Sequence, residues 1–341
     1  MHEALLAEKI SGSVVRCNIC RWRCTIQPEQ TGVCRMYRNV KGVLYNLNYG
    51  LASSVAVDPI EKKPLFHFHP GTQVFSLGGW GCNFHCQDCQ NWEISMVKDV
   101  LKESEKISPQ TAVDLAKQNH CQGIAWTYNE PSMWFEYTLD TAKLAKQNNL
   151  YTVYVTNGYL SPEALDIIGP YLDAWRVDIK GFSDKLYQDL AKITHWRGIL
   201  ETAQRAKKKW QMHVEVVTNI IPTMNDDDAQ LGGIAGWIAK ELGTETPWHV
   251  TRFHPNYMIS DLPATPVATL EHAYELGRKA GLKFIYLGNV PGHASETTVC
   301  FSCGKPVVER VGYQTNVCGL NESRCKYCGA ELNFTVNRGG K

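Results

Sequence analysis

The sequence has almost no net charge and no long apolar run. Its 341 residues include 35 lysines and arginines against 34 aspartates and glutamates, which gives no electrostatic reason to expect nucleic acid or an anionic membrane surface as a partner. No apolar stretch reaches the roughly 18 residues that a membrane-spanning helix needs, and the first residues lack the pattern of a signal peptide. We therefore expect a cytoplasmic protein that binds neither membranes nor nucleic acid.

Cysteine, in contrast, is abundant, with 13 in the chain. Cytosolic thiols are kept reduced, so clustered cysteines predict metal sites rather than disulfides. Cys121 stands apart from the rest, and we expect it to be an ordinary buried side chain. The other cysteines form three groups, which are Cys17, Cys20, Cys24 and Cys34, then Cys82, Cys86 and Cys89, and then Cys300, Cys303, Cys318, Cys325 and Cys328.

Between residues 72 and 290, apolar β-rich runs alternate with helical patterns. Ser108, Ser161 and Thr265 each offer a helix N-cap followed by proline. Such alternation predicts a parallel sheet. About six or seven strand–helix units favour an α/β fold built as a partial or complete βα barrel, with its active site at the carboxyl ends of the strands. The expected strands span residues 72–77, 123–128, 151–156, 174–179, 213–220, 248–253 and 283–287.

The two ends of the chain differ from this central region. Residues 1–70 bear cysteines and lack a strong periodic signal, whereas the end of the chain carries two CxxCG motifs. We predict an N-terminal cysteine-bearing module over residues 1–70, the barrel over 71–292, and a zinc-ribbon-like C-terminal module over 293–341.

Polar side chains collect directly after the expected strands. The stretches TYNEP (127–131), TNG (156–158) and DIKG (178–181) follow the second, third and fourth strands, and RFHPN (252–256) follows the sixth. Any one of these residues can be explained as a helix N-cap or a surface loop residue. Their recurrence after each strand favours a ring of active-site residues.

The three cysteines of residues 82–89 have the spacing C-x3-C-x2-C and follow the first expected strand. A structural zinc site has four protein ligands, so three thiolates leave one position open. A [4Fe–4S] cluster held by three cysteines would leave one iron free for another ligand. Zinc would need a distant fourth ligand, such as His85 or His69, and three unrelated buried thiols are the remaining alternative.

With this loop the sequence resembles the radical S-adenosylmethionine (SAM) enzymes, whose signature is the same cysteine spacing after the first barrel strand. The likeness extends to the branch of the pyruvate formate-lyase activating enzymes, and it is strongest toward the radical SAM members of the AmmeMemoRadiSam system. It is carried by an ordered set of motifs along nearly the whole chain, which are RCNICRWRC...GVCR (16–35), AVDPIEKKPLFHFHPG (56–71), GCNFHCQDCQNWEIS (81–95), TYNEP, VTNGY, VDIKGF, IPTMND, RFHPNY and LGNVPG...CFSCG.

The resemblance implies an enzyme in which Cys82, Cys86 and Cys89 hold a [4Fe–4S] cluster whose fourth iron binds SAM. Reductive cleavage of SAM would give methionine and a 5′-deoxyadenosyl radical that takes hydrogen from a substrate, with a protein or peptide as one substrate class. The electron donor would be a flavodoxin or a ferredoxin-like protein. The protein itself supplies positioning, electrostatics and water exclusion.

Matching positions imply the SAM contacts. Asn129 and Glu130 stand where the family contacts the methionyl amine, and Thr156 and Asn157 where it approaches the ribose and the sulfonium. On the fifth strand Val217 replaces the arginine of the activating enzymes, and Glu215 shares that wall. The remaining implied SAM contacts are Asp178, Lys180, Asn219 and His254.

Two further metal sites are expected at the flanks. Cys300, Cys303, Cys325 and Cys328 form two CxxCG knuckles that predict structural zinc, with an accessory cluster or redox dithiols as alternatives and Cys318 as a spare thiol. The N-terminal group has an irregular spacing that fits either zinc or a second iron–sulfur cluster, and its members are Cys17, Cys20, Cys24 and Cys34.

The sequence therefore leaves three functions open. The first is a radical SAM enzyme that acts on an unidentified substrate. The second, within the same class, is the activation of a glycyl-radical enzyme. The third is a non-catalytic module that binds zinc at all three cysteine groups.

Overall fold

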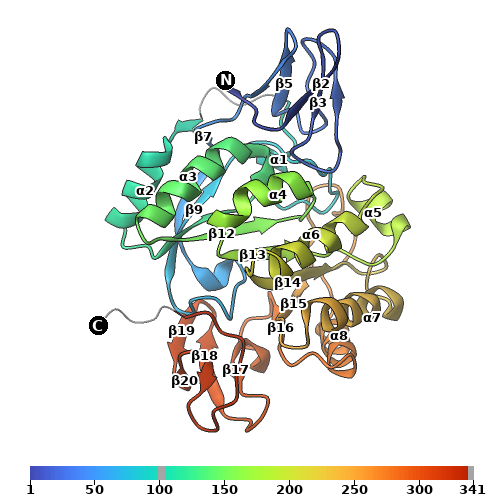
Figure 1. Ribbon diagram of the computed structural model, residues 1–341. Helices are drawn as coiled ribbons and strands as arrows, with labels where there is room; N and C mark the ends of the chain where they lie inside the picture. Colours follow the sequence, from blue (N-terminus) through green and yellow to red (C-terminus); the bar gives the residue numbers. More distant parts are fainter. Residues whose placement is uncertain (99–103, 337–341) are drawn as a thin grey trace. The chain divides into compact units, whose positions relative to one another are not determined.

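The computed structural model describes residues 1–98 and 104–336, so the end of the expected C-terminal module, residues 337–341, lies outside the described residues. Its main feature is an eight-stranded sheet (Figure 1). In sheet order the strands are β16 (Ile285–Gly288), β15 (Trp248–Arg252), β14 (His213–Ile220), β13 (Ala174–Asp178), β12 (Tyr151–Thr156), β11 (Gly123–Trp126), β9 (Gln73–Gly78) and β8 (Ser54–Pro59). β9, β11 and β12 pair in parallel, as do β14, β15 and β16. The expected α/β fold with a largely parallel sheet is confirmed.

The chain forms two compact units, each made of several segments. Unit 1 comprises Met1–Asp58, Gln73–Trp175 and Leu190–Met212, and unit 2 comprises Pro59–Thr72, Arg176–Asp189 and His213–Lys341. Besides its sheet strands, unit 1 holds β1 (His2–Glu3), β2 (Ala7–Ser11), β3 (Val14–Cys17), β4 (Thr25–Ile26), β5 (Tyr37–Val40), β6 (Val43–Asn46), β7 (Leu51–Ala52), α1 (Trp92–Ser95), β10 (Glu105–Lys106), α2 (Pro109–Gln118), η2 (Pro131–Trp134), α3 (Phe135–Gln147), α4 (Pro162–Ile168), η3 (Gly169–Tyr171) and α6 (Arg197–Lys208).

Unit 2 contains the last strands of the sheet and the C-terminal strands. Its further elements are η1 (Ile60–Lys62), α5 (Asp184–Leu190), α7 (Asp228–Trp237), η4 (Ile238–Leu242), α8 (Val267–Lys279), η5 (Ala294–Glu296), β17 (Thr298–Val299), β18 (Pro306–Val311), β19 (Gln314–Val317), β20 (Leu320–Asn321) and β21 (Arg324–Cys325). None of the helices in the described part of the chain is both long enough and apolar enough to cross a membrane.

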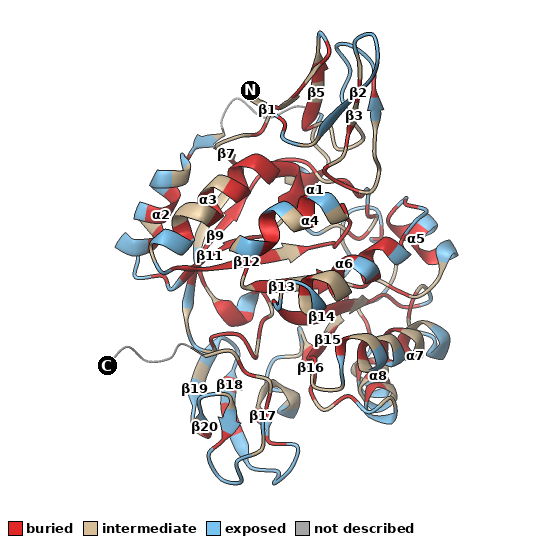
Figure 2. Cartoon of the chain, in the orientation of Figure 1, coloured by how far each residue is buried: buried red, intermediate tan, exposed pale blue. Residues whose placement is uncertain are grey.

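The sheet strands lie where apolar β-branched runs predict them. β12 and β14 have the predicted bounds, and the other predicted strands differ by one or two residues. β11, β12 and β14 are almost wholly buried, whereas helices such as α2 and α8 bury only one side (Figure 2). α2, for example, buries Ala112, Val113 and Ala116 and exposes its polar residues. This arrangement is the amphipathic pattern of helices that cover a buried sheet.

The predicted helix starts are confirmed at two of three sites. Ser108 Oγ accepts from Thr111 N at 3.0 Å at the start of α2, and Ser161 Oγ accepts from Ala164 N at 3.1 Å at the start of α4. The prediction for Thr265 is wrong, because α8 begins at Val267 with Pro266 as its N-cap. The Thr265 hydroxyl instead donates to the backbone oxygen of Ile220 and accepts from Phe253 N, so it links two strand ends.

The N-terminal segment of unit 1 forms two small antiparallel sheets, β2-β3-β4 and β1-β6-β5. Buried hydrogen bonds fix it to α3. The Glu136 carboxylate accepts from Tyr37 Oη at 2.8 Å, from Asn46 Nδ2 at 2.8 Å and from Leu5 N at 3.1 Å. A fully buried carboxylate with three donors holds a fixed geometry, so the N-terminal cysteines are rigidly placed within this unit.

Candidate active site and metal centres

The loop after β9 carries the cysteine triad in unit 1. Cys86 is buried, and Cys82 and Cys89 are partly exposed. Burial raises the pKa of the Cys82 thiol, and the neighbouring Cys86, Glu130 and Cys89 raise it further. The three thiols therefore converge on one place, where a positive metal centre would be needed to hold them as thiolates.

Asn129 and a glycine give the start of this loop its shape. Asn129 Oδ1 accepts from Gly79 N at 3.1 Å, and Asn129 Nδ2 donates to the backbone oxygen of Gly81 at 2.8 Å. Gly81 has a φ of +78°, and a Cβ at this position would lie 2.6 Å from Met36 Cγ. The close approach requires glycine, so the backbone before Cys82 is set by the residues on both sides of it.

Glu130 lies in the loop that follows β11, and it is 2% exposed. Its Oε1 accepts from Ser132 N and Ser132 Oγ, and its Oε2 accepts from Asn157 N at 2.8 Å. The Thr156 hydroxyl lies 2.9 Å from both oxygens. Burial raises the pKa of the Glu130 carboxyl, while these donors oppose the rise. Glu130 thus ties the end of β11 to the end of β12.

Asn157 connects this pair of strand ends to the cysteine loop. Its Nδ2 donates to Asn83 Oδ1 at 2.7 Å and lies 3.8 Å from Cys82 Sγ. Because Asn157 N is held by Glu130, its side chain has a fixed direction. The expected residues Asn129, Glu130, Thr156 and Asn157 are therefore brought together around Cys82 within unit 1.

The other expected SAM contacts lie in unit 2. Asp178 Oδ1 accepts from Arg176 Nη1 at 2.5 Å, and Lys180 Nζ lies 3.4 Å from Asp178 Oδ2. Burial acts to raise the pKa of Asp178, but Arg176 and Lys180 outweigh it and hold the pKa below its usual range. Asn219 is half-buried at the end of β14, and His254 is exposed after β15.

Glu215 does not line an open wall as expected. It is fully buried within unit 2, where its carboxylate accepts from His213 Nε2 at 2.9 Å and from His249 Nε2 at 2.6 Å. It also accepts from the backbone N–H groups of Phe66 and His67. Burial alone would raise the pKa of Glu215, but these partners hold it well below its usual range. His213 and Glu215 share one face of β14 by period 2, but the other partners come from distant segments that no sequence pattern links to them.

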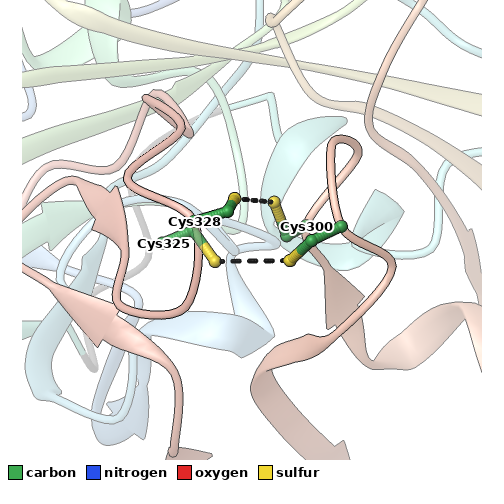
Figure 3. Close-up of side chains that lie close together, drawn as sticks. Cys300, Cys325 and Cys328 are labelled. Atoms are coloured by element: carbon green, nitrogen blue, oxygen red, sulfur yellow. Dashed lines mark hydrogen bonds between the residues drawn. The ribbon is translucent and has the colours of Figure 1, made fainter.

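The C-terminal group has the geometry of a single metal site (Figure 3). The Sγ atoms of Cys300 and Cys328 are 3.6 Å apart, and those of Cys303 and Cys325 are 3.7 Å apart. All four sulfurs lie within 4.8 Å of one another. Tetrahedral zinc with Zn–S bonds of about 2.3 Å places its sulfurs about 3.8 Å apart. Cys318 is not in this group, and its thiol faces the backbone oxygen of Pro306.

Among the described residues, the C-terminal set is the one group of three or more histidine, cysteine or acidic side chains with all ligand atoms within 4.8 Å. The sulfurs of Cys82, Cys86 and Cys89 do not all lie within 4.8 Å of one another. A cluster binds each cysteine through a different iron, so the wider spacing fits a [4Fe–4S] group.

The N-terminal cysteines face a common pocket in unit 1. Cys17 and Cys20 are buried, and Cys24 and Cys34 are partly exposed. Burial raises the pKa of the Cys34 thiol to about 11. These four thiols therefore line one pocket although Cys17 and Cys34 are 17 positions apart in the sequence.

Comparison with known proteins gives a consistent picture. Residues 79–231 match the profile of the Radical SAM superfamily. The chain is 42% identical over 338 residues to uncharacterized protein MJ0808 of Methanocaldococcus jannaschii, covering 98% of this chain and all of that protein. It is 27% identical over 131 residues to the isethionate sulfite-lyase activating enzyme of Nitratidesulfovibrio vulgaris, covering 37% of this chain and 42% of that enzyme.

Among solved structures, a radical SAM methyltransferase from Sphaerobacter thermophilus is similar in fold, with a TM-score of 0.50 and 14% identity. The alignment covers 70% of this chain and 71% of that chain. At this identity the likeness concerns the fold alone.

Proposed function

The chain belongs to the radical SAM superfamily, and from this premise we propose that it is a radical SAM enzyme in which Cys82, Cys86 and Cys89 hold a [4Fe–4S] cluster. The observation that carries the proposal is that these three thiols lie together in the loop after β9, within the segment that matches the family. Three cysteines leave one iron for an outside ligand, and SAM is that ligand in our proposal.

The cluster with bound SAM would supply one-electron cleavage of SAM to methionine and a 5′-deoxyadenosyl radical. This radical would take hydrogen from a protein or peptide substrate. The residues of unit 1 prepare the site for it. Asn129 fixes the backbone before Cys82, and Asn157 directs an amide N–H toward the Cys82 sulfur. An N–H group near a cluster sulfur favours the reduced state by stabilising negative charge.

Glu130 is a positioning residue in this proposal. Its oxygens hold the backbone and side chains of Ser132, Thr156 and Asn157, so it aligns the ends of β11 and β12. Asn129 and Thr156 are assigned to the methionyl end and the ribose of SAM by their place in the family pattern. Asp178, Lys180, Asn219 and His254 are kept as candidate SAM contacts on the same grounds.

A second candidate function is the activation of a glycyl-radical enzyme. It is supported by the partial likeness to the isethionate sulfite-lyase activating enzyme, whose name says that it activates another enzyme. That likeness covers a minor share of the chain, so it supports the chemistry of the core more strongly than the identity of a partner. For either function the electron donor would be a flavodoxin or a ferredoxin-like protein.

The C-terminal cysteines are assigned to structural zinc. The support is their sulfur spacing, which matches one tetrahedral ion. A core of Val307, Val308 and Leu332 packs around the buried Cys300 and Cys325, so the ion would fix the strands of this module.

The test is anaerobic reduction of the reconstituted protein in the presence of SAM. We expect release of 5′-deoxyadenosine and methionine from the wild type, and none from Cys82→Ala. Cys121→Ala is the matched control, because Cys121 lies outside all three groups, and it should behave as the wild type. Equal product from the wild type and from Cys82→Ala would refute the proposed function.

A further inference from the structure

The N-terminal cysteines surround a space that protein atoms leave open. All four cysteines of this group line one pocket. Its walls come from a short stretch of the chain and one residue of η2, and they are Cys17, Ile19, Cys20, Trp22, Cys24, Gly32, Val33, Cys34, Tyr37 and Met133. Apart from the sulfurs, this lining is largely apolar, as expected for a site that shields a metal centre from water.

The backbone turns that present the thiols are ordered by hydrogen bonds. Cys17 N donates to the backbone oxygen of Cys24 at 2.9 Å, and Arg23 N donates to the backbone oxygen of Cys20 at 3.1 Å. Arg35 N donates to the backbone oxygen of Gly32 at 2.9 Å, which forms a separate turn around Cys34. The folded backbone therefore fixes where the sulfurs lie, and the distances between the sulfurs indicate which metal group the cysteines bind.

Sulfur spacing separates zinc from a cluster. One tetrahedral ion holds its sulfurs about 3.8 Å apart, and the C-terminal cysteines of this same chain meet that condition. No three of the N-terminal sulfurs lie within 4.8 Å of one another in the described residues. They share this wider spacing with Cys82, Cys86 and Cys89.

We propose that Cys17, Cys20, Cys24 and Cys34 hold a second [4Fe–4S] cluster rather than zinc. With four cysteine ligands every iron has a protein ligand, so this site has no position for SAM. Its chemistry is one-electron transfer.

The second site lies against the cysteine loop of the first, and both belong to unit 1. Trp22 Nε1 donates to the backbone oxygen of Asn83 at 2.8 Å. The Asn83 side chain, 1% exposed, places its Oδ1 3.9 Å from Cys82 Sγ. Burial raises the pKa of the Cys20 thiol, and the Asn83 side chain opposes that rise. Asn83 Nδ2 is buried without a hydrogen-bond partner, so it has N–H groups available for a ligand.

This contact defines a route for an electron. One electron would pass from a flavodoxin- or ferredoxin-like donor to the N-terminal site and from there to the Cys82 site. The donor is oxidised by one electron, the Cys82 site is reduced by one, and the N-terminal site returns to its starting state. The route rests on the proposed function, whereas the metal assignment of the N-terminal site does not.

The test is the metal content of anaerobically reconstituted, full-length protein. We expect about eight irons per wild-type chain and about four in the triple variant Cys82→Ala, Cys86→Ala, Cys89→Ala, since each cluster holds four. The double variant Cys24→Ala, Cys34→Ala should also fall to about four. Cys121→Ala is the control and should match the wild type, and zinc should stay at about one per chain throughout.

The outcomes distinguish the second cluster at the N-terminal cysteines from the proposed function of the Cys82 site. An iron-free triple variant overturns the second cluster, whether its zinc content is one or two per chain. About four irons per chain in both the wild type and the triple variant supports the second cluster and refutes the proposed function instead. If the triple variant fails to fold, electron paramagnetic resonance of the reduced wild type decides. Two signals that broaden each other, with one that responds to SAM, support the proposal, and a single signal overturns it.

Discussion

Because the His67 ring is buried, we expect unit 2 to lose stability in mild acid. The ring is fully buried and stacks on Phe334 with centroids 4.0 Å apart. Its Nδ1 lies 3.0 Å from the backbone oxygen of Leu332, which can only accept, so Nδ1 carries the proton. Nε2 then accepts from Tyr286 Oη at 2.6 Å. A second proton on the ring would remove this acceptor inside a buried site.

The pKa of His67 gives the size of the effect. Burial lowers it from 6.5 to about 3, Glu215 opposes that change, and His213 and Arg310 add to it. The folded protein therefore holds His67 neutral where the unfolded chain would protonate it. Its contribution to stability is complete above pH 6.5 and is lost as the pH falls toward 3. Between pH 7 and pH 5 this linkage amounts to about 2 kcal/mol.

The assay is urea unfolding of the wild type and His67→Asn at pH 7, 6 and 5, with equal metal loading confirmed for both. Asparagine keeps a donor for Leu332 and does not titrate. We expect the variant to be less stable at pH 7 and to lose about 2 kcal/mol less than the wild type between pH 7 and pH 5. His120→Asn, at an exposed position, should leave the pH dependence unchanged. Parallel curves for the wild type and His67→Asn would refute the reasoning.

Three further predictions follow from the sites. Gly81→Ala should reduce iron content and lower stability by about 1–3 kcal/mol, because its Cβ would meet Met36 and the φ of this residue is positive. Gly232→Ala in α7, where a Cβ would meet open space, should keep the full iron content. Equal loss of iron in both variants would contradict this prediction. Glu130→Gln should cost about 1–3 kcal/mol of stability, measured by thermal unfolding, because it places an amide against N–H donors. It should also slow the release of 5′-deoxyadenosine, measured by chromatography. An unchanged melting temperature would contradict the positioning role of Glu130. Cys328→Ser should lose zinc by elemental analysis without loss of iron, and a loss of iron alone would contradict the zinc assignment.

The sheet could be predicted from the sequence because buried parallel strands are continuous apolar runs. β8 was missed, since its six residues are mostly only partly buried and lack a clean pattern. The Thr265 cap was mispredicted because capping and strand-end bonding use the same hydroxyl, and the choice between them depends on Ile220 and Phe253.

The cysteine groups could be found from spacing, but the metal of each group could not. C-x2-C pairs occur in both zinc and cluster sites, and what distinguishes them is how far apart the folded backbone holds the sulfurs. The contact of Asn83 with Trp22 and with Cys82 joins two cysteine segments that lie about sixty positions apart. The network of Glu215 likewise combines His67, His213 and His249 from separate segments, so no local pattern contains it.

The most direct measurement of the central claim is electron paramagnetic resonance of the dithionite-reduced protein, recorded with and without SAM. We use Cys24→Ala, Cys34→Ala, so that the signal of the Cys82 site is recorded alone. We expect a reduced cluster signal whose shape changes when SAM is added, because one iron is open to it. A cluster signal that stays the same at saturating SAM, or no cluster signal while Cys82, Cys86 and Cys89 are intact, would contradict the account.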